Sequence, residues 1–584
     1  MKRFSPLSAL GAIALALGWS LALQAADAPD LILHHGKVVT VDRDFSVHEA
    51  IAVREGKIDT VGKNEEILAL KGEKTELIDL AGKMLMPGLM DSHTHPTGAA
   101  MYEFDHAIPE MNSIADVLKY VRGRAEVLDD GEWIFVSQVF ITRLAERRYP
   151  TKAELDEAAP KNPVFFRTGP DASLNSLALK LSGIDKNFKE GATGHIERDA
   201  NGEPTGILRN SSQHVKYQAP KSQKKAAADD RQKQLQSLFA DYNAVGITAI
   251  GDRDCGRDAV ELYQKLLDAN QLSVRISCSR SLGSGGTTDS IRAAVKAIAE
   301  EPQRKGGSHM LRIVGIKTYL DGGMLTGSAF MRQPWGVSKI YSITDPEYRG
   351  LKFIPQERLN FMVHAVAEQG LQFTAHSVGD GAVHSLIEAY EEAAKKLPIA
   401  ETRPCITHCN FMSAEAIERM KKLGVVADIQ PAWLYLDGAT LNEQFGDERL
   451  RYFQPLKSLF AAGVAAGGGS DHMQRIGSLR SVNPYNPWLG MWTTIARQPR
   501  RLGRALHAEE SLSREQAIRF YTTQNAKVLF LEKTTGSLEP GKLADMIVVD
   551  RDLLTCPVDE IRETQVLKTF LGGRLVFRGG HAND

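Results

Sequence analysis

An apolar segment that ends in two histidines organises this chain, and it reads Met86-Pro87-Gly88-Leu89-Met90-Asp91-Ser92-His93-Thr94-His95-Pro96. His93 and His95 are two residues apart, so in an extended strand their side chains lie on the same face. Pro96 cannot donate a ladder hydrogen bond and is expected to end the strand. Two imidazoles on one face could bind a divalent ion, although a lone pair of this kind is more often two polar residues in a loop. The rest of the chain decides between these interpretations.

Seven later segments are also short apolar runs bounded by turn or polar residues. They span 246–252, 272–278, 311–317, 371–376, 405–408, 425–430 and 464–471. Amphipathic stretches at 356–369 and 413–423 lie between them, and each stops at a glycine, as helices commonly do. Together with the segment before Pro96, this pattern predicts an α/β fold, a (β/α)8 TIM-like barrel. The working face of such a barrel lies at the carboxyl ends of its strands.

The two ends of the chain differ from its middle. Short alternating segments with glycine turns occupy 31–62 and recur at 544–577, which is typical of antiparallel sheet. We therefore expect a composite β-sandwich domain made of 27–87 and 536–584, around a barrel made of 88–96 and 236–535. The interval 97–235 is too long for one crossover, and it is predicted to be an inserted subdomain that forms a lid or wall. Within it, the polar stretch 221–233 indicates a solvated helix.

Residues of the kinds that bind metals recur at the ends of these predicted strands. Five different strands supply them, and they are His93, His95, Lys317, His376, His408 and Asp471. Because the carboxyl ends of barrel strands meet at one rim, we expect all six side chains to converge there. Taken singly, His376 or His408 could as well be a structural histidine. Five strands that deliver such residues to one rim are a far more specific signal.

Lys317 is the most informative of the six. Strand alternation places it inside the barrel with Ile313 and Gly315, where an ammonium is costly unless it is paired or loses its charge. Pairing with Asp321 is one solution. Reaction of the neutral amine with carbon dioxide is the other, and it gives a carbamate whose two oxygens can bridge two metal ions. Beside four histidines and an aspartate, we favour the carbamate.

These motifs resemble the amidohydrolase superfamily, and specifically the YtcJ-like members of family 3, which include N-substituted formamide deformylases. The likeness extends over most of the chain and is carried by the segments 86–95, 315–322, 375–380, 407–408, 469–471 and 536–545. The resemblance implies a metal-dependent hydrolase with a barrel and a β-sandwich. In that pattern the last segment returns the chain to the sandwich.

The resemblance also implies roles for the six residues. One ion would be held by His93, His95 and Asp471, and a second by the histidines of the fifth and sixth strands, with carbamylated Lys317 between them. Zinc is the expected metal because imidazole and carboxylate donors suit it, although iron, manganese and nickel accept them too, and a single ion would also be compatible. The metal would activate water for attack on a carbonyl. Asp471 would take the water proton and return it to the leaving nitrogen.

Three segments depart from the family pattern. Residues 168–173 read Thr-Gly-Pro-Asp-Ala-Ser where relatives have Asp-Gly-His-Ser, 407–409 read Thr-His-Cys in place of Glu-His-Ala, and His472-Met473 replace a small residue and proline. These changes leave the proposed ligands intact but lie where substrate should be held. The substrate therefore cannot be carried over from relatives. Aromatic residues that are candidates to line the pocket are Trp335, Trp433, Tyr435 and Trp488.

Three functions are compatible with this sequence. The leading one is an exported amidohydrolase that cleaves a non-peptide C–N bond of a small molecule, such as an N-formyl or N-acyl amine or a cyclic amide. The same metal site could instead serve a lactone, ester or organophosphate hydrolase. A catalytically silent extracytoplasmic binding or regulatory protein is the third, and Asp471 argues against it because binding alone needs no proton shuttle. Association into a homo-oligomer is compatible with any of them.

Composition and the N-terminus limit partners and location. A formal net charge of −1 and the lack of basic runs give no electrostatic footprint for nucleic acid. Residues 1–26 combine a basic start, an apolar middle and small residues at the end, which predicts a signal peptide and a periplasmic or secreted protein. No other segment is long and apolar enough to span a membrane. Five scattered cysteines do not indicate a disulfide framework.

Overall fold

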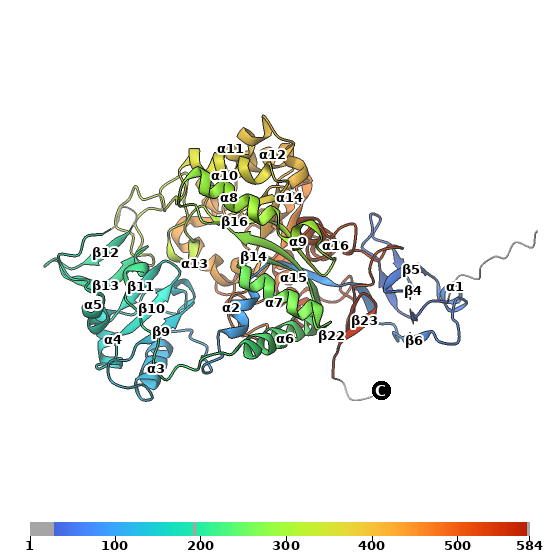
Figure 1. Ribbon diagram of the computed structural model, residues 1–584, viewed down its shortest axis with the longest axis horizontal. Coiled ribbons are helices and arrows are strands. Elements are labelled where there is room, and N and C mark those ends of the chain that lie inside the picture. The colour runs from blue at the N-terminus through green and yellow to red at the C-terminus, as the bar shows by residue number, and fades with distance from the viewer. Residues whose placement is uncertain (1–27, 191–193, 581–584) are drawn as a thin grey trace, which may run out of the picture.

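The computed structural model describes residues 28–190 and 194–580. The expected signal peptide, residues 1–26, lies outside the described residues. Figure 1 shows three parts side by side: a central barrel wrapped by helices, an inserted subdomain on one side, and a small sheet near the start of the chain on the opposite side.

Eight parallel strands form the central sheet in the order β20-β19-β18-β17-β16-β15-β14-β8. They are β8 (Leu89–Thr94), β14 (Ile247–Cys255), β15 (Arg275–Ser281), β16 (Leu311–Tyr319), β17 (Gln372–Ser377), β18 (Cys405–His408), β19 (Val426–Ile429) and β20 (Ala466–Gly468). The chain that leaves β20 returns to β8. There the Asp471 amide donates to the His93 carbonyl over 2.8 Å, and Thr94 forms an isolated parallel β-bridge with His472. The predicted barrel is confirmed.

Helices follow the strands and cover the outside of the barrel (Figure 1). The main ones are α7 (Arg257–Asp268), α8 (Thr288–Ala299), α10 (Gln356–Ala367), α11 (Asp380–Ala394), α12 (Ala414–Leu423) and α14 (Leu456–Ala462). The two helices expected from glycine stops are α10 and α12. Ser413 caps α12 by accepting a hydrogen bond from the Ala416 amide, and Gly424 ends it at a φ of 68°, which favours glycine.

The helix expected at 221–233 is displaced in the structure. The helix there is α6 (Ala228–Ala244), so residues 221–227 are not helical. Asp229 and Asp230 lie in its first turn, where carboxylates complement the helix dipole, whereas the lysines before Ala227 would oppose it. The helical part of the predicted range, 228–233, is exposed or half-buried, as expected, whereas Leu235, Leu238 and Phe239 further along α6 are buried against the barrel.

Both ends of the chain contribute to one six-stranded sheet, ordered β23-β22-β21-β7-β2-β3. Its strands are β2 (Lys37–Val39), β3 (Val47–His48), β7 (Met84–Pro87), β21 (Met546–Val549), β22 (Val566–Leu571) and β23 (Arg574–Arg578). A four-stranded sheet, ordered β5-β4-β1-β6, packs with it and consists of β1 (Leu31–His34), β4 (Ala50–Arg54), β5 (Lys57–Gly62) and β6 (Glu76–Asp79). The β-sandwich is therefore built from both termini, as predicted.

The inserted subdomain contains a five-stranded sheet ordered β12-β13-β11-β10-β9. Its strands are β9 (Ile134–Ser137), β10 (Val164–Thr168), β11 (Asp171–Leu174), β12 (His195–Arg198) and β13 (Pro204–Arg209), with α3 (Ile114–Ala125), α4 (Lys152–Ala158) and α5 (Ser176–Ser182) beside them. All of these lie between β8 and β14 in the chain. The insertion after the first barrel strand is confirmed.

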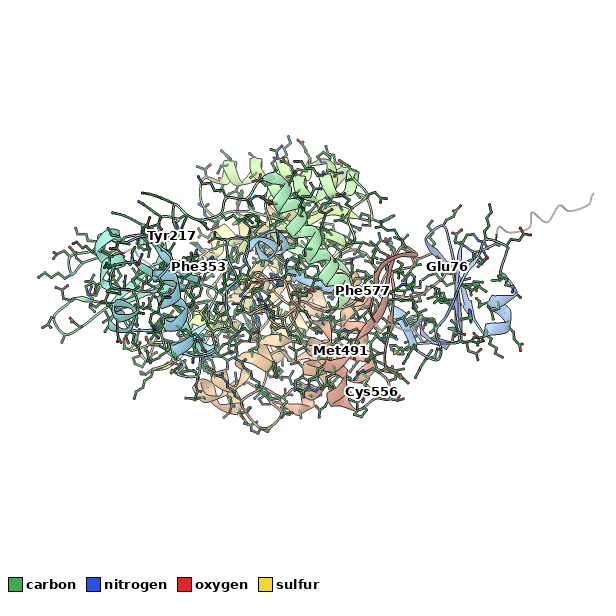
Figure 2. The ribbon with its side chains drawn as sticks, turned by 90° about the horizontal axis from the view of Figure 1, so that it is seen from below. Glu76, Tyr217, Phe353, Met491, Cys556 and Phe577 are labelled. Atoms are coloured by element: carbon green, nitrogen blue, oxygen red, sulfur yellow. The ribbon has the colours of Figure 1, made fainter. Side chains whose placement is uncertain are left out.

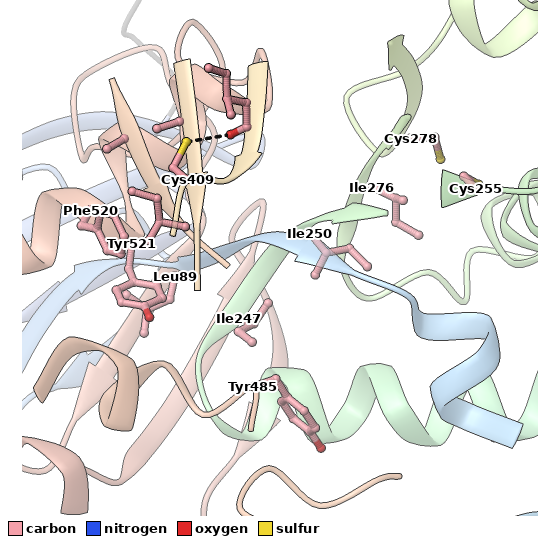
Figure 3. Close-up of a cluster of buried hydrophobic side chains, with 14 of the residues drawn as sticks. Leu89, Ile247, Ile250, Cys255, Ile276, Cys278, Cys409, Tyr485, Phe520 and Tyr521 are labelled. Carbon is pink, nitrogen blue, oxygen red and sulfur yellow. Dashed lines mark hydrogen bonds between the residues drawn. The ribbon is translucent and has the colours of Figure 1, made fainter. Parts of the chain in front are cut away.

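A continuous apolar core holds the barrel strands in place. Leu89, Ile247, Ile250 and Ile276 from β8, β14 and β15 belong to the same buried cluster as Phe520 of α16 (Arg514–Tyr521), as Figure 3 shows. Because side chains alternate along a strand, this packing also fixes which residues face the barrel mouth.

No helix within the described residues has the length and apolar character that a membrane crossing needs.

Candidate metal centre

All six residues predicted from the sequence line one cavity of about 440 Å³ at the carboxyl ends of the barrel strands. His93 belongs to β8 and His95 follows it, Lys317 lies in β16, His376 in β17, His408 ends β18, and Asp471 follows β20. His408 and Asp471 adopt positive φ angles of 84° and 55°. Such angles are unfavourable for side chains with a Cβ and cluster at functional sites.

His93, His95 and Asp471 form one half of the site. Asp471 Oδ1 lies 3.3 Å from His93 Nε2 and 3.1 Å from His95 Nε2, and the two imidazole nitrogens are 3.2 Å apart. Asp428 orients the His93 ring, because its Oδ2 accepts a hydrogen bond from His93 Nδ1 over 2.9 Å. The unprotonated Nε2 of His93 therefore faces Asp471.

His376 and His408 form the other half. His408 Nδ1 donates to Gln430 Oε1 over 2.7 Å, and His376 Nε2 faces the Gly322 carbonyl over 3.4 Å. With those protons placed, His408 Nε2 and His376 Nδ1 point lone pairs at each other across 2.8 Å. In these tautomers both nitrogens are available to one metal ion, which would lie beside the line that joins them. His408 also stacks on Trp433, with ring centroids 5.0 Å apart.

Lys317 lies in the floor of the cavity with 1% of its surface exposed. Among the described residues no carboxylate lies within 4.0 Å of its ammonium, and its Nζ lies over the Tyr319 ring, 4.4 Å from the centroid. The alternative partner, Asp321, instead accepts from the Phe330, Val378 and Gly379 amides at 2.9–3.0 Å. An ion pair with Asp321 therefore does not explain the buried lysine.

Burial and neighbouring charges set the protonation of these groups. Burial and, after it, the charge of nearby Lys317 lower the pKa of His376 to about 3. Burial also lowers the pKa of Lys317, against the pull of Asp254 and Asp471. For Asp471 burial raises the pKa, but the surrounding histidines outweigh it and hold the pKa well below its ordinary value. Neutral imidazoles and an ionised carboxylate are the forms that bind metal ions.

Sequence reasoning missed the residue that orients His93. Asp428 is fully buried in β19 and accepts from Ser92 Oγ over 2.7 Å and Gln430 Nε2 over 3.0 Å, in addition to His93. A carboxylate behind a histidine fixes its tautomer and raises its basicity as a ligand. The signal was present in the sequence, since Asp428 and Gln430 alternate within an otherwise apolar strand.

The segments that depart from the family pattern contribute to the cavity wall. Arg167, Gly169 and Pro170 of the inserted subdomain line it, as does Met473 after the eighth strand. Of the four candidate aromatics, Trp433 lines it, whereas Trp335, Tyr435 and Trp488 are not among its described lining residues. Phe353, labelled in Figure 2, is an aromatic wall residue that the sequence did not single out.

The donor set fits a divalent metal. One atom each of His93, His408 and Asp471 lies within 4.8 Å of the others, and all three residues are buried. Both histidine pairs present ring nitrogens to the cavity, and the remaining ring nitrogens of His93, His408 and His376 are held by Asp428, Gln430 and a backbone carbonyl. Nitrogen and carboxylate donors of this kind suit zinc and other transition metals.

Barrel and site together define a hydrolase of the metal-dependent (β/α)8 type. The chain belongs to the amidohydrolase family, whose model matches residues 76–577. The resemblance seen in the sequence is thereby confirmed.

Individual proteins resemble the chain over nearly its whole length. It is 29% identical to an N-substituted formamide deformylase of Arthrobacter pascens, over 94% of this chain and 98% of the relative. It is 24% identical to the protein YtcJ of Bacillus subtilis, over 94% and 99%. Among solved structures, a metal-dependent hydrolase of Pyrococcus horikoshii superposes with a TM-score of 0.64 at 21% identity, over 91% of this chain and 99% of the other, which supports the fold.

Proposed function

We propose that this protein is an exported amidohydrolase that cleaves a non-peptide C–N bond of a small molecule, an N-formyl or N-acyl amine or a cyclic amide. The observation that carries the proposal is the convergence of six metal-type side chains from five strands in one cavity. The similarity of this chain to an N-substituted formamide deformylase over nearly its whole length favours an amide substrate over other carbonyl compounds.

The six residues would hold one or two divalent ions, with zinc the metal expected. His93, His95 and Asp471 are proposed for one position and His376 and His408 for the other. Lys317 is proposed to lie between them as a carbamate, formed when its neutral amine adds to carbon dioxide and releases one proton. Its burial and lowered pKa favour the neutral amine that this reaction requires.

A divalent ion bound there would lower the pKa of a water molecule and polarise a substrate carbonyl. Asp471 is ionised and faces the histidine nitrogens, so its carboxylate can accept the proton of the attacking water. The same carboxyl group would then give that proton to the departing nitrogen. Trp433, Phe353 and Leu325 form apolar walls that would hold the body of the substrate and exclude bulk water.

Turnover of a mixed substrate panel tests the proposal. Formamides, N-acyl amines and lactones would be offered to the purified protein before chelation, after chelation, and after zinc is restored. We expect amide hydrolysis that chelation abolishes and zinc restores. Hydrolysis of lactones alone would replace the amide assignment with the lactonase alternative, and ligand binding without any turnover would favour a silent binding protein.

The export part of the proposal has a separate test. The full-length chain would be expressed in a Gram-negative host and its periplasmic and cytoplasmic fractions compared, with residues 1–26 deleted as the control. We expect the mature protein in the periplasm only when those residues are present. A full-length chain that stays in the cytoplasm uncleaved would contradict export.

A further inference from the structure

The catalytic cavity has one positively charged wall residue besides its metal-type side chains. Its walls are largely apolar and include Phe140, Met324, Leu325, Phe353 and Trp433. Among the described lining residues, Arg167 of the inserted subdomain is the only arginine. It lies directly before the segment 168–173, whose sequence departs from the family pattern, and neither the metal site nor the proton shuttle uses it.

Arg167 is an exposed side chain at the rim of the cavity, and local structure holds it there. Strands β10 and β11 form a hairpin in which Thr168 pairs with Asp171, with Gly169 and Pro170 as the turn. Gly169 has a φ of 62°, which favours glycine at the tip. Arg167 Nε donates to the Gly169 carbonyl over 3.1 Å, so the side chain is held against its own turn. Its two terminal nitrogens donate to none of the described residues.

Nearby carboxylates are committed elsewhere. Asp171, across the turn, pairs with Arg209 over 2.9 Å and accepts from the Asn210 amide over 2.7 Å and from Tyr149 over 3.0 Å. Asp321 is held by three backbone amides, and Asp471 faces the histidines. Within the described residues no carboxylate lies within 4.0 Å of the Arg167 guanidinium. Within the described residues its charge therefore has no ionic partner, and the exposed guanidinium is open to solvent and to a ligand.

We propose that Arg167 binds a carboxylate of the substrate. This inference rests on the proposed function and deepens it: the substrate is an amide whose apolar body ends in a free carboxylate, as in an N-acylated hydrophobic amino acid. The apolar walls hold the body, and the metal-type residues receive the amide. A guanidinium with two free terminal nitrogens matches a carboxylate in bidentate geometry. One arginine among apolar groups suits a single carboxylate better than a phosphate, which needs more donors.

Matched substrate pairs test this assignment. N-formylphenylalanine would be compared with N-formylphenylalaninamide, and N-succinylbenzylamine with N-acetylbenzylamine, so that the carboxylate lies on the amine side in one pair and on the acyl side in the other. The readouts are kcat/KM for each compound and the dissociation constant of each measured by calorimetry. Wild type would be compared with Arg167→Met and Arg167→Lys. Arg122→Met is the control, because Arg122 on α3 of the same subdomain is exposed like Arg167 but does not line the cavity.

We expect wild type to prefer the acid in at least one pair, and Arg167→Met to reduce that preference by about 10- to 100-fold. Arg167→Lys should keep part of the preference, because lysine keeps the charge but cannot bind a carboxylate in bidentate geometry. Arg122→Met should keep all of the preference. Equal preference in wild type and Arg167→Met would overturn the inference even if amides are hydrolysed. If nothing is hydrolysed but the acids bind more weakly to Arg167→Met, the proposed function fails while the carboxylate site stands.

Discussion

Asp428 illustrates how one residue behind the site controls a ligand in it. Its carboxylate accepts from His93 Nδ1 over 2.9 Å and so leaves Nε2 free to bind metal. Asp428→Asn should therefore weaken metal binding about 10- to 100-fold, measured by competition with a chelator of known affinity. Asp130→Asn is the matched control, since Asp130 forms only a surface ion pair with Lys161. Unchanged affinity in Asp428→Asn would show that the carboxylate does not orient His93.

The lowered pKa of His376 predicts how the stability of the metal-free protein changes at acid pH. Burial lowers its pKa to about 3, below the ordinary value of 6.5, so between these pH values the unfolded chain binds more protons than the folded one. Stability then rises with pH across that window and is lost as pH falls from 6.5 towards 3. Thermal unfolding of metal-free protein across this range should show a shallower decline in His376→Gln than in wild type. Parallel curves would contradict this account of His376.

At the residue scale, the sequence identified the donors but not their supports. His93, His95 and Asp471 could be found because a charged or imidazole side chain at the end of an apolar strand is conspicuous. Asp428 and Gln430 were overlooked because they lie within a strand, and the alternation that should have flagged them spans only three residues. Arg167 carried no signal at all, since one arginine in a strand is ordinary until its surroundings are known.

Gly469, which follows β20, packs closely against the site. A Cβ at Gly469 would lie 2.8 Å from His93 Cβ and 3.0 Å from Asp428 Oδ1, so Gly469→Ala must displace the ligand or its support. We expect a loss of about 1–3 kcal/mol in the free energy of unfolding, together with weaker metal binding. Urea denaturation and chelator competition would measure the two effects.

Gly256→Ala is the control for that substitution. A Cβ at Gly256 meets no heavy atom within 4 Å, and its φ of −71° suits alanine. We expect its stability and metal affinity to stay close to wild type. If Gly469→Ala behaved in the same way, the close approach of β20 to His93 would have no energetic consequence.

At the element scale, the strands could be predicted from the sequence, but the start of one helix could not, because charge determines where it begins. Eight short strands could be predicted because buried parallel strands are nearly continuous apolar runs. The stretch 221–233 misled because its polar residues suit a helix in composition, whereas its lysines oppose the positive end of a helix dipole. The chain instead enters α6 at Ala228, and the Lys221 and Lys224 amides donate to Glu132 and Asp105.

Considered as a whole, the molecule ties its barrel to both chain ends. Strand β7 pairs antiparallel with β21, Met84 opposite Val549, and β7 leads directly into β8 and the first two histidines. The sandwich therefore anchors the strand that carries His93. This arrangement could be predicted because both ends of the sequence have short alternating segments with glycine turns. Which strands pair is set by packing between residues more than 400 apart in the chain, as the Met84–Val549 pair shows. No local pattern encodes that.

Metal content tests the central claim most directly, that the six converging residues form a metal centre. Wild type and Lys317→Ala would be purified without added metal, reconstituted with zinc and bicarbonate, and analysed for metal per chain. We predict one or two divalent ions per wild-type chain, and fewer in Lys317→Ala because that variant lacks the proposed bridging carbamate. Wild-type protein that holds almost no metal after reconstitution would contradict the metal centre and the hydrolase proposed from it.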